Sequence, residues 1–366
     1  TAVALSTIVR QCELRNDDDR LREMWPVMLR GMEHLRRMRD DSFKLGKDYP
    51  AYGLFQPSFG DGGIYGPEPE YTTPMNVILG LSDAYRAGKR LKLPRYEEFG
   101  VFAQELMARM RECIERDRRT TPEGIPYVPL SMAENESYKP QTGCATIARV
   151  AFHGEFEPDD RIVTDLLRLI DACDDREGIP ECTGWRSDQS IYTYSSVRFA
   201  QLLLQAGQRE KAADYLYAFA NHASASRVWR EEQPVRETHS AEICGDMPHN
   251  WASVEFIRLV RNLVVLETFT GVELLPGLPE EWLPRAGDSL VLEKTPTRFG
   301  KLSLELSVRG KGGCLLSVAR EDGNQQPQYL RLHWAGKAVL DGEELEKSNG
   351  KYLLPLEEKQ VCIELF

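Results

Sequence analysis

The chain contains 366 residues, of which 42% are hydrophobic and 28% are charged. That composition is typical of a soluble globular protein, and the length suffices for one large domain and one small domain. The 57 acidic side chains outnumber the 46 basic ones and give a formal net charge of −11, which argues against nucleic acid and anionic membranes as partners. No apolar run approaches the roughly 18 residues that a membrane span requires.

The first third of the chain predicts helices. Apolar side chains recur there at helical spacing, at Leu21, Met24, Trp25, Met28, Met32 and Leu35. The three aspartates Asp17, Asp18 and Asp19 precede that series and are suited to cap the start of a helix. Pro26 falls inside the pattern, so we expect a break or a new first helical turn there.

Two loops in the first half of the chain carry candidate acids. Residues 53–64 form a Gly-rich stretch with one carboxylate, Asp61, and an ordinary turn is the simplest interpretation of these residues by themselves. Residues 127–138 match neither helical nor strand periodicity. Glu134 and Glu136 are candidate acids there, with a solvated loop as the simpler interpretation.

The middle of the chain predicts further helices, which come in pairs. We expect a helix that begins at Thr73–Pro74, one from about 95 to 116, one that begins at Pro158, and a helical hairpin that turns at Ala206–Gly207. The loop 183–189 contributes Trp185 and Asp188 as substrate-binding candidates. If consecutive hairpins form a ring, the loops that carry these candidates lie together at one end.

The segment 226–260 contains the densest group of chemically useful side chains. It holds the paired carboxylates of Glu231 and Glu232 and, around them, Trp229, Arg230, His249, Asn250 and Trp251. Carboxylates supply general acid and base chemistry and indole faces stack on pyranose rings, so this composition suits a site that cleaves sugars. A solvated charged loop is the alternative, because adjacent carboxylates are often surface residues.

The two glutamates are not expected to be equivalent. Successive side chains of an extended or irregular loop point to opposite sides, so only one of them can face a cavity. We expect the cavity carboxylate to be partly desolvated against Trp229 and to have the higher pKa of the two. We favour Glu232 for that position, with Glu231 as the alternative.

The eight cysteines are scattered along the chain without a Cys-x-x-Cys pair. They predict free thiols, although Cys173 and Cys182 could pair in an oxidising compartment. One metal-like group of side chains occurs, made up of His239, Cys244, Asp246 and His249. Its spacing matches no zinc pattern, so we expect neither a metal nor a cofactor.

The sequence favours a cytoplasmic location, or a periplasmic or secreted one if a signal peptide has been removed.

After residues 275–279, Leu-Pro-Gly-Leu-Pro, the periodicity changes from helical to alternating. Apolar side chains alternate at Leu302, Leu304, Leu306 and Val308. Asp341–Gly342 and Asn349–Gly350 are typical hairpin turns. We therefore predict a mainly α protein, with a helical domain over residues 1–275 and a small antiparallel β-sandwich over residues 276–366.

The late motifs resemble those of a known enzyme family. Trp229-Arg230-Glu231-Glu232, followed by His249-Asn250-Trp251-Ala252 at the start of a helix, resembles the last active-site loop of bacterial α-L-rhamnosidases and their six-hairpin glycosidase relatives. In that family a Trp-Glu pair supplies the general base and an Asn-His-Tyr-Ala-type turn supplies a sugar-binding histidine. Here Arg230 separates the Trp from the Glu, and His249 precedes Asn250.

Other parts of the chain resemble the same family. The loop with Asp61 is similar to its pocket-lining Phe-Gly-Asp-Trp loop, with Gly62 in place of the Trp, and this resemblance implies that Asp61 is a pocket residue in preference to an ordinary turn residue. The C-terminal strands are similar to the β-sandwich that follows its helical barrel. The resemblance implies an (α/α) toroid followed by a β-sandwich and inverting hydrolysis of a glycosidic bond in a plant or bacterial oligosaccharide. In that mechanism Glu231 or Glu232 would activate water, and Asp61 or Glu134 would be the acid.

One family feature is missing. The barrel of the family has more helices than this sequence predicts, and its Asp-Cys-Pro-Gln-Arg-type motif, which carries the acid, is absent here. The chain also begins at Thr1. We therefore expect that the natural N-terminus is absent or processed, so that the partner is the missing N-terminal part of the same polypeptide, or else a second copy in a homodimer.

Two other functions remain open. One is a non-catalytic carbohydrate-binding segment of a larger glycosidase. The other is a polysaccharide lyase on a similar toroid, in which Tyr192, Tyr194 or His249 abstracts a proton and an arginine neutralises the uronate.

Overall fold

The structure is a computed structural model that describes residues 1–59, 67–132, 137–145, 155–173, 178–184, 189–234, 245–309 and 312–366. Its contacts divide the chain into two compact units. The first unit comprises Thr1–Val9 and Arg22–Ile257, and the second comprises Arg10–Leu21 and Arg258–Phe366. Among the described helices, none has the length and apolar character needed to cross a membrane.

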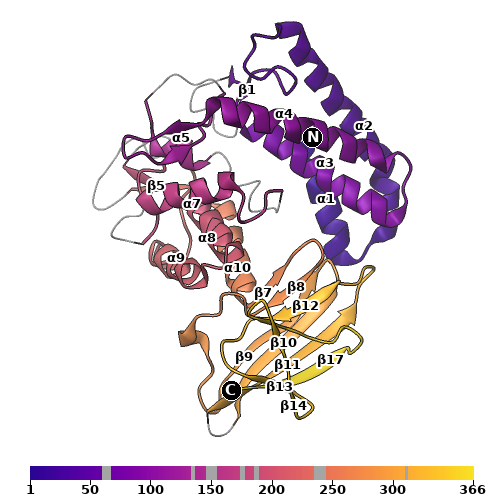
Figure 1. Ribbon diagram of the computed structural model, residues 1–366, viewed down its shortest axis with the longest axis vertical. Coiled ribbons are helices and arrows are strands. Elements are labelled where there is room, and N and C mark those ends of the chain that lie inside the picture. Colours follow the sequence, from indigo (N-terminus) through magenta and orange to yellow (C-terminus); the bar gives the residue numbers. More distant parts are fainter. Residues whose placement is uncertain are drawn as a thin grey trace. The chain divides into compact units, whose positions relative to one another are not determined.

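The first unit is helical (Figure 1). The helices that contribute to it are α1 (Ala2–Arg15), α2 (Asp18–Ser42), α3 (Thr72–Leu91), α4 (Tyr96–Asp117), α5 (Pro140–Ala145), α7 (Arg161–Cys173), α8 (Thr193–Gln205), α9 (Arg209–Asn221), α10 (Asn250–Val264) and the 3-10 turn η1 (Phe43–Leu45). Its strands form three short antiparallel pairs, β1 (Ser58–Phe59) with β2 (Pro67–Glu68), β3 (Arg119–Thr120) with β4 (Pro126–Tyr127), and β5 (Ser190–Tyr192) with β6 (Glu232–Pro234).

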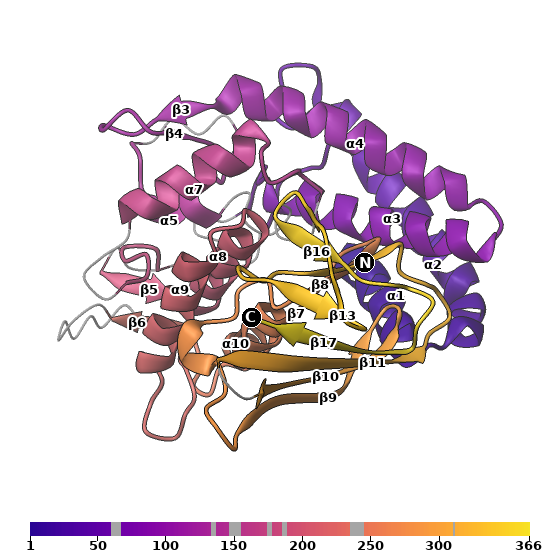
Figure 2. The ribbon, with the colours of Figure 1, turned by 60° about the horizontal axis from the view of Figure 1, so that its bottom comes forward.

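Successive helices of this unit pack as hairpins. Helix α3 lies along α4, and α8 lies along α9 (Figure 2). The close approach of α3 and α4 needs a small residue, because a Cβ added at Gly100 would lie 2.7 Å from the ring of Tyr85. Consecutive helical hairpins followed by β-sheets are the architecture that the sequence predicts, an (α/α) toroid with a β-sandwich.

Helix α2 corrects one expectation. It runs through Pro26 without a break. Leu21 and Trp25 on one side of the proline and Met28 and Met32 on the other are all buried. A continuous helix keeps these four side chains on one face, and that burial offsets the backbone hydrogen bond that the proline cannot donate.

The second unit consists mainly of two packed sheets. The strands are β7 (Val265–Glu267), β8 (Gly271–Leu274), β9 (Ser289–Thr297), β10 (Gly300–Arg309), β11 (Gly313–Asp322), β12 (Tyr329–Leu332), β13 (Ala338–Leu340), β14 (Glu343–Glu344), β15 (Lys347–Ser348), β16 (Lys351–Leu353) and β17 (Gln360–Leu365), with the 3-10 turn η2 (Glu280–Trp282). The six-stranded sheet has the order β14-β13-β17-β11-β10-β9, and the five-stranded sheet has the order β15-β16-β12-β8-β7. Pairing is antiparallel except between β12 and β8, which run parallel.

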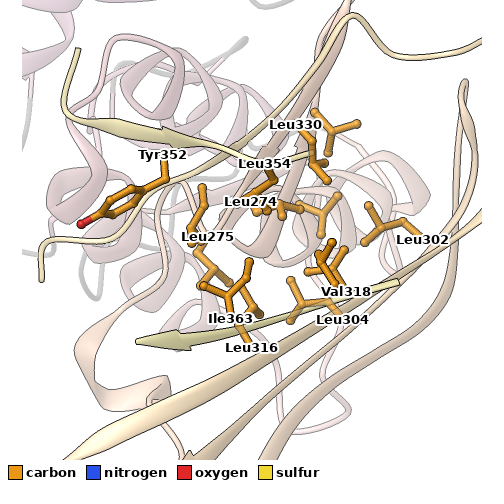
Figure 3. Packing of buried hydrophobic residues seen from close by; sticks show 14 of the residues in the cluster. Leu274, Leu275, Leu302, Leu304, Leu316, Val318, Leu330, Tyr352, Leu354 and Ile363 are labelled. Carbon is orange, nitrogen blue, oxygen red and sulfur yellow. The ribbon is translucent and has the colours of Figure 1, made fainter. Parts of the chain in front are cut away.

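The core of this unit lies between the two sheets. Leu274 and Leu330 from the five-stranded sheet face Leu304, Leu316 and Ile363 from the six-stranded sheet (Figure 3). All five side chains are almost fully buried. The alternation of buried and exposed positions along β10 is therefore the signature of a sheet with one face on a core, as the sequence predicts.

The division of the chain differs from the expected boundary at 275/276. It falls between Ile257 and Arg258 and assigns Arg10–Leu21 to the second unit. Strand β7 pairs with β8 in the five-stranded sheet and precedes the expected boundary. The domain boundary expected between residues 275 and 276 stays a prediction.

Within the second unit, Glu267, whose side chain is 5% exposed, contacts the segment Arg10–Leu21. The carboxylate of Glu267 accepts hydrogen bonds from Arg10, from Arg261 at 3.4 Å and from the backbone N–H of Arg298 at 2.8 Å. Further along, the side-chain amide of Asn324 donates to the carbonyl oxygen of Asn16 at 2.7 Å. These contacts explain why Arg10–Leu21 belongs to this unit.

Candidate active site

Strands β5 and β6 hold the two candidate glutamates beside the start of helix α8. The register pairs Tyr192 with Glu232. The hydroxyl of Thr193 lies 2.7 Å from the carbonyl oxygen of Arg230 and 2.9 Å from that of Glu231. The backbone N–H of Thr193 also donates to the carbonyl of Glu231 at 3.1 Å. The backbone that carries the carboxylates is therefore fixed by hydrogen bonds to a helix terminus.

The two glutamates differ in burial. Glu232 is 0% exposed, and the hydroxyl of Ser190 donates to its carboxylate at 3.4 Å. Glu231 is partly exposed. This difference follows from the alternation of side chains in an extended segment. Glu231 is therefore the more accessible of the two glutamates.

The segment that leads into helix α10 returns to Glu231. The N–H of Glu231 donates to the carbonyl of Asp246 at 3.2 Å, and the N–H of His249 donates to the carbonyl of Trp229 at 2.8 Å. Gly245 has a φ of +88°, and a Cβ added there would lie 2.2 Å from the Cβ of Glu231. This close approach therefore requires glycine.

The backbone contacts of the segment before helix α10 bring Glu231, Asp246 and His249 together. One ligand atom from each of these side chains lies within 4.8 Å of the others. The Nδ1 of His249 is 2.7 Å from Oδ1 of Asp246, and this hydrogen bond lowers the pKa of the aspartate. His249 is only 9% exposed, and its Nε2 has no hydrogen-bond partner within the described part of the chain.

An aromatic group surrounds the histidine. The ring of Tyr194 stacks on His249 at 5.3 Å and meets the edge of Trp251 at 5.3 Å. The hydroxyls of Tyr192 and Tyr194 share a short hydrogen bond. Both tyrosines are buried, whereas Trp251 is 46% exposed. Trp251 thus presents indole surface at the edge of the site, which a sugar ring can cover.

Helix α8 adds a charged residue behind this aromatic group. The guanidinium of Arg198 lies 4.7 Å from the centre of the Tyr194 ring and donates to Glu255 of α10 at 3.2 Å. The cation–π contact and the ion pair link α8 to α10, and they hold Tyr194 in position against His249.

Trp229 has the contacts of a core residue. Its ring stacks on Phe219 at 4.6 Å and lies 4.9 Å from Phe256, and its Nε1 donates to the carbonyl of Phe219 at 2.8 Å. The side chain is 5% exposed. Sugar stacking by Trp229 would require the ring to leave this packing, whereas Trp251 is already exposed.

The remaining predicted residues fall into two groups. Outside the described residues lie Asp61, Glu134, Trp185 and Asp188, together with His239 and Cys244 of the metal-like group. Within the described residues, Asn250 is exposed at the first position of α10, and Arg230 donates to the carbonyl of Gly245 at 3.1 Å. The structure therefore brings together Glu231, His249 and Trp251 from the predicted set.

The sequence did not predict a role in this site for several of its residues. Asp246 entered only through the metal-like group, and Tyr194 only through the lyase alternative. Arg198 and Glu255 were missed. The one available signal was the spacing of Tyr194 and Arg198, four residues apart on a helix, which places both side chains on one face.

Comparisons with known proteins show similarity of fold. No protein-family model matches the chain, and no curated protein matches it. An α-L-rhamnosidase structure from Dictyoglumus thermophilum superposes with a TM-score of 0.54 and 11% identity, covering 95% of this chain and 37% of that chain. A sialidase structure gives a TM-score of 0.52 and 10% identity, covering 98% of this chain and 32% of that chain.

The coverage and the sequence identity limit what the two superpositions show. This chain spans 37% and 32% of the lengths of the two structures. At such low identity, the superposition shows the fold alone. The fold implied by the sequence resemblance, helical hairpins followed by a β-sandwich as in α-L-rhamnosidase structures, is thereby confirmed.

Proposed function

We propose that this chain belongs to a glycoside hydrolase and that Glu231 is its general base. The observation that carries the proposal is the difference in burial between the paired carboxylates. A general base must contact the water molecule that it activates. Glu231 is partly exposed beside His249, whereas Glu232 is fully buried. This accessibility favours Glu231 as the base. The sequence by itself favours Glu232.

The proposed reaction is hydrolysis with inversion. An acid protonates the glycosidic oxygen while the bond to the anomeric carbon breaks, and Glu231 takes a proton from the water that attacks the opposite face. Asp61 and Glu134 are the proposed acids. The products are an alcohol and a sugar of inverted anomeric configuration, so one water molecule is consumed.

The proposed substrate is an α-L-rhamnoside in a plant or bacterial oligosaccharide. The late motifs support it because they resemble the rhamnosidase loop, and the fold supports it because it is similar to that of a solved α-L-rhamnosidase. Trp251 is proposed to stack on the sugar, since its indole is exposed, while Arg230, His249 and Asn250 supply polar contacts.

A hydrolysis assay with a panel of aryl glycosides, which includes an aryl α-L-rhamnoside, tests this proposal directly. We expect the Glu231→Gln variant to lose about 10²–10⁴-fold in kcat, which is the usual contribution of a general base. NMR of the first product should show the inverted anomer. Thermal melts of each variant establish that the fold is intact.

The matched control is Glu232→Gln. Loss of turnover in the Glu232 variant, with Glu231→Gln fully active and both variants folded, would reverse the assignment. Equal and modest losses in both would mean that neither carboxylate is the base, which would favour the non-catalytic carbohydrate-binding segment.

A second candidate function is a polysaccharide lyase, which one observation favours. The imidazole of His249 stacks on Tyr194, and its Nε2 has no hydrogen-bond partner among the described residues. A lyase uses such a nitrogen or a tyrosine oxygen to take the proton α to a uronate carboxyl group. Incubation with polyuronates and detection of an unsaturated product by ultraviolet absorbance separates the two functions.

A further inference from the structure

We propose that Asp246 is a positioning residue for His249. Its carboxylate holds the imidazole in one tautomer, and Nε2 of the ring is thereby made an acceptor for a hydroxyl group of the ligand. The contact with the ligand rests on the proposed function, because it requires a sugar at this site. The tautomer does not rest on it, because the contact between the two side chains determines the tautomer.

The hydrogen bond between the two side chains fixes the position of the proton. Nδ1 of His249 lies 2.7 Å from Oδ1 of Asp246. This hydrogen bond lowers the pKa of Asp246, so the carboxyl group is ionised near neutral pH. An ionised carboxylate can only accept a hydrogen bond, and Nδ1 must therefore be the donor. Because a neutral imidazole has one N–H, the lone pair is assigned to Nε2, on the other side of the ring.

Backbone contacts keep the two residues at this separation. The carbonyl of Asp246 accepts from the N–H of Glu231 at 3.2 Å, and the N–H of His249 donates to the carbonyl of Trp229 at 2.8 Å. The carbonyl of His249 accepts from the N–H of Ser253 at 3.2 Å. The side chain of Asp246 is 75% exposed, and an ion pair so exposed contributes little to stability. The effect of the carboxylate is therefore on the orientation and tautomer of the ring.

The other nitrogen of the ring supplies a second, independent observation. His249 is 9% exposed, and its Nε2 makes no hydrogen bond within the part of the chain that the structure describes. Tyr194 stacks on the imidazole, and Arg198 lies against the tyrosine ring. Trp251, whose ring centre lies 6.1 Å from that of the imidazole, is 46% exposed. A ligand hydroxyl beside Trp251 would give Nε2 the donor that it lacks.

The tautomer selects the chemistry of the ligand group at this position. A lone pair on Nε2 accepts the hydrogen of a hydroxyl group, whereas a carboxylate has only acceptor oxygens and cannot pair with it. Without Asp246, the proton can move to Nε2, which then donates and no longer accepts. The assigned tautomer therefore favours a neutral sugar over a uronate at this position.

NMR of the full chain with ¹⁵N-labelled histidine tests the tautomer. At about pH 8.5, where ordinary histidine side chains are neutral, we expect a protonated Nδ1 and an unprotonated Nε2 for His249. The His249→Gln variant identifies its signals among the six histidines. Asp246→Ala should move the proton towards Nε2, because the hydrogen bond at one nitrogen decides which nitrogen is protonated. The exposed Asp288→Ala is the matched control and should leave the tautomer unchanged.

Kinetics with an aryl α-L-rhamnoside test the contact with the ligand. Asp246→Ala should raise KM by about 2–10-fold, which is the usual contribution of one neutral hydrogen bond, with a smaller effect on kcat. Asp288→Ala should keep the KM of the wild-type chain. Thermal melts should give similar melting temperatures for both variants, because both aspartates are exposed.

The outcomes separate this inference from the proposed function. A proton on Nε2 in the wild-type chain, or an unchanged tautomer in Asp246→Ala, would overturn the role of Asp246 and leave hydrolysis untouched. A changed tautomer with an unchanged KM would overturn the contact between Nε2 and the ligand. The expected tautomers in a chain that hydrolyses no glycoside would support the role of Asp246 and count against the glycosidase.

Discussion

The hydroxyl of Thr193 lies 2.9 Å from the carbonyl oxygen of Glu231 and so ties the start of helix α8 to the candidate base. Thr193→Val keeps the shape of the side chain and removes the hydroxyl. We expect the free energy of unfolding to fall by about 1 kcal/mol, because one buried hydrogen bond is lost. Chemical denaturation measures this change, and turnover should fall as well because the carboxylate is held less firmly.

The control for this variant is Thr164→Val. The hydroxyl of Thr164 donates to the carbonyl of Arg161 at 3.1 Å, but the residue is exposed on helix α7. We expect a change within about 0.5 kcal/mol. Similar losses in both variants would show that the Thr193 contact has no special role.

The two tryptophans of the candidate site should respond differently to truncation. Trp229→Ala removes a buried ring between Phe219 and Phe256 and should lower the free energy of unfolding by about 3–5 kcal/mol. Trp251→Ala should change stability much less because the side chain is 46% exposed. If Trp251 stacks on a sugar, this second variant should raise KM for the glycoside. A stable Trp229→Ala variant would contradict the core position of Trp229.

Acid should weaken the second unit through Glu273. Burial by itself raises the pKa of this carboxyl, but the hydrogen bonds and charges of His333 and Lys351 outweigh it and hold the pKa below the ordinary value of 4.5. The native state then binds fewer protons than the unfolded state as pH falls below 4.5. The contribution of Glu273 to stability is therefore complete above that pH and is lost below it.

The variant Glu273→Gln isolates this effect. It should be less stable than the wild-type chain near neutral pH, because His333 at 2.6 Å and Lys351 at 3.3 Å lose a charged acceptor. The difference should shrink as the wild-type carboxyl is protonated. Denaturation across this pH range measures it, and a difference that stays constant with pH would exclude Glu273 as the source.

Cys144 and Cys173 should form a disulfide on oxidation. Their sulfur atoms are 3.8 Å apart, and neither cysteine forms a disulfide within the described part of the chain. With oxidised glutathione, the two thiols each lose a hydrogen, an S–S bond forms, and two molecules of reduced glutathione are released. Peptide mapping under non-reducing conditions should find this pair. Cys182→Ser should leave the link intact and Cys144→Ala should abolish it, whereas linkage of Cys173 to Cys182 would favour the sequence expectation instead.

The regular elements were predictable because their periodicity depends on few neighbours. The apolar series from Leu21 predicts a buried helical face, and the alternation from Leu302 predicts a strand with one face on a core. Pro26 was misinterpreted because a local rule against proline was outweighed by burial along the whole helix. The parallel pairing of β12 with β8 depends on long-range packing that no local pattern records.

The sequence indicated the segment that carries the candidate site residues but not their packing. The pattern around Glu231 lies in the segment where the structure places Glu231 close to Asp246 and His249. It could not show that Trp229 is packed between two phenylalanines, because those residues come from helices on either side of the loop. It also could not show which glutamate is buried, since that depends on the pairing of β5 with β6.

The assignment of Arg10–Leu21 to the second unit has a consequence for biosynthesis. Asn16 leaves the ribosome 308 residues before its partner Asn324. The segment Arg10–Leu21 must therefore wait until those residues have been synthesised before its contacts can form, and contacts so distant in sequence slow folding. A fragment that starts at Arg258 lacks this segment, so supplying Arg10–Leu21 as a separate peptide should improve its yield of folded protein.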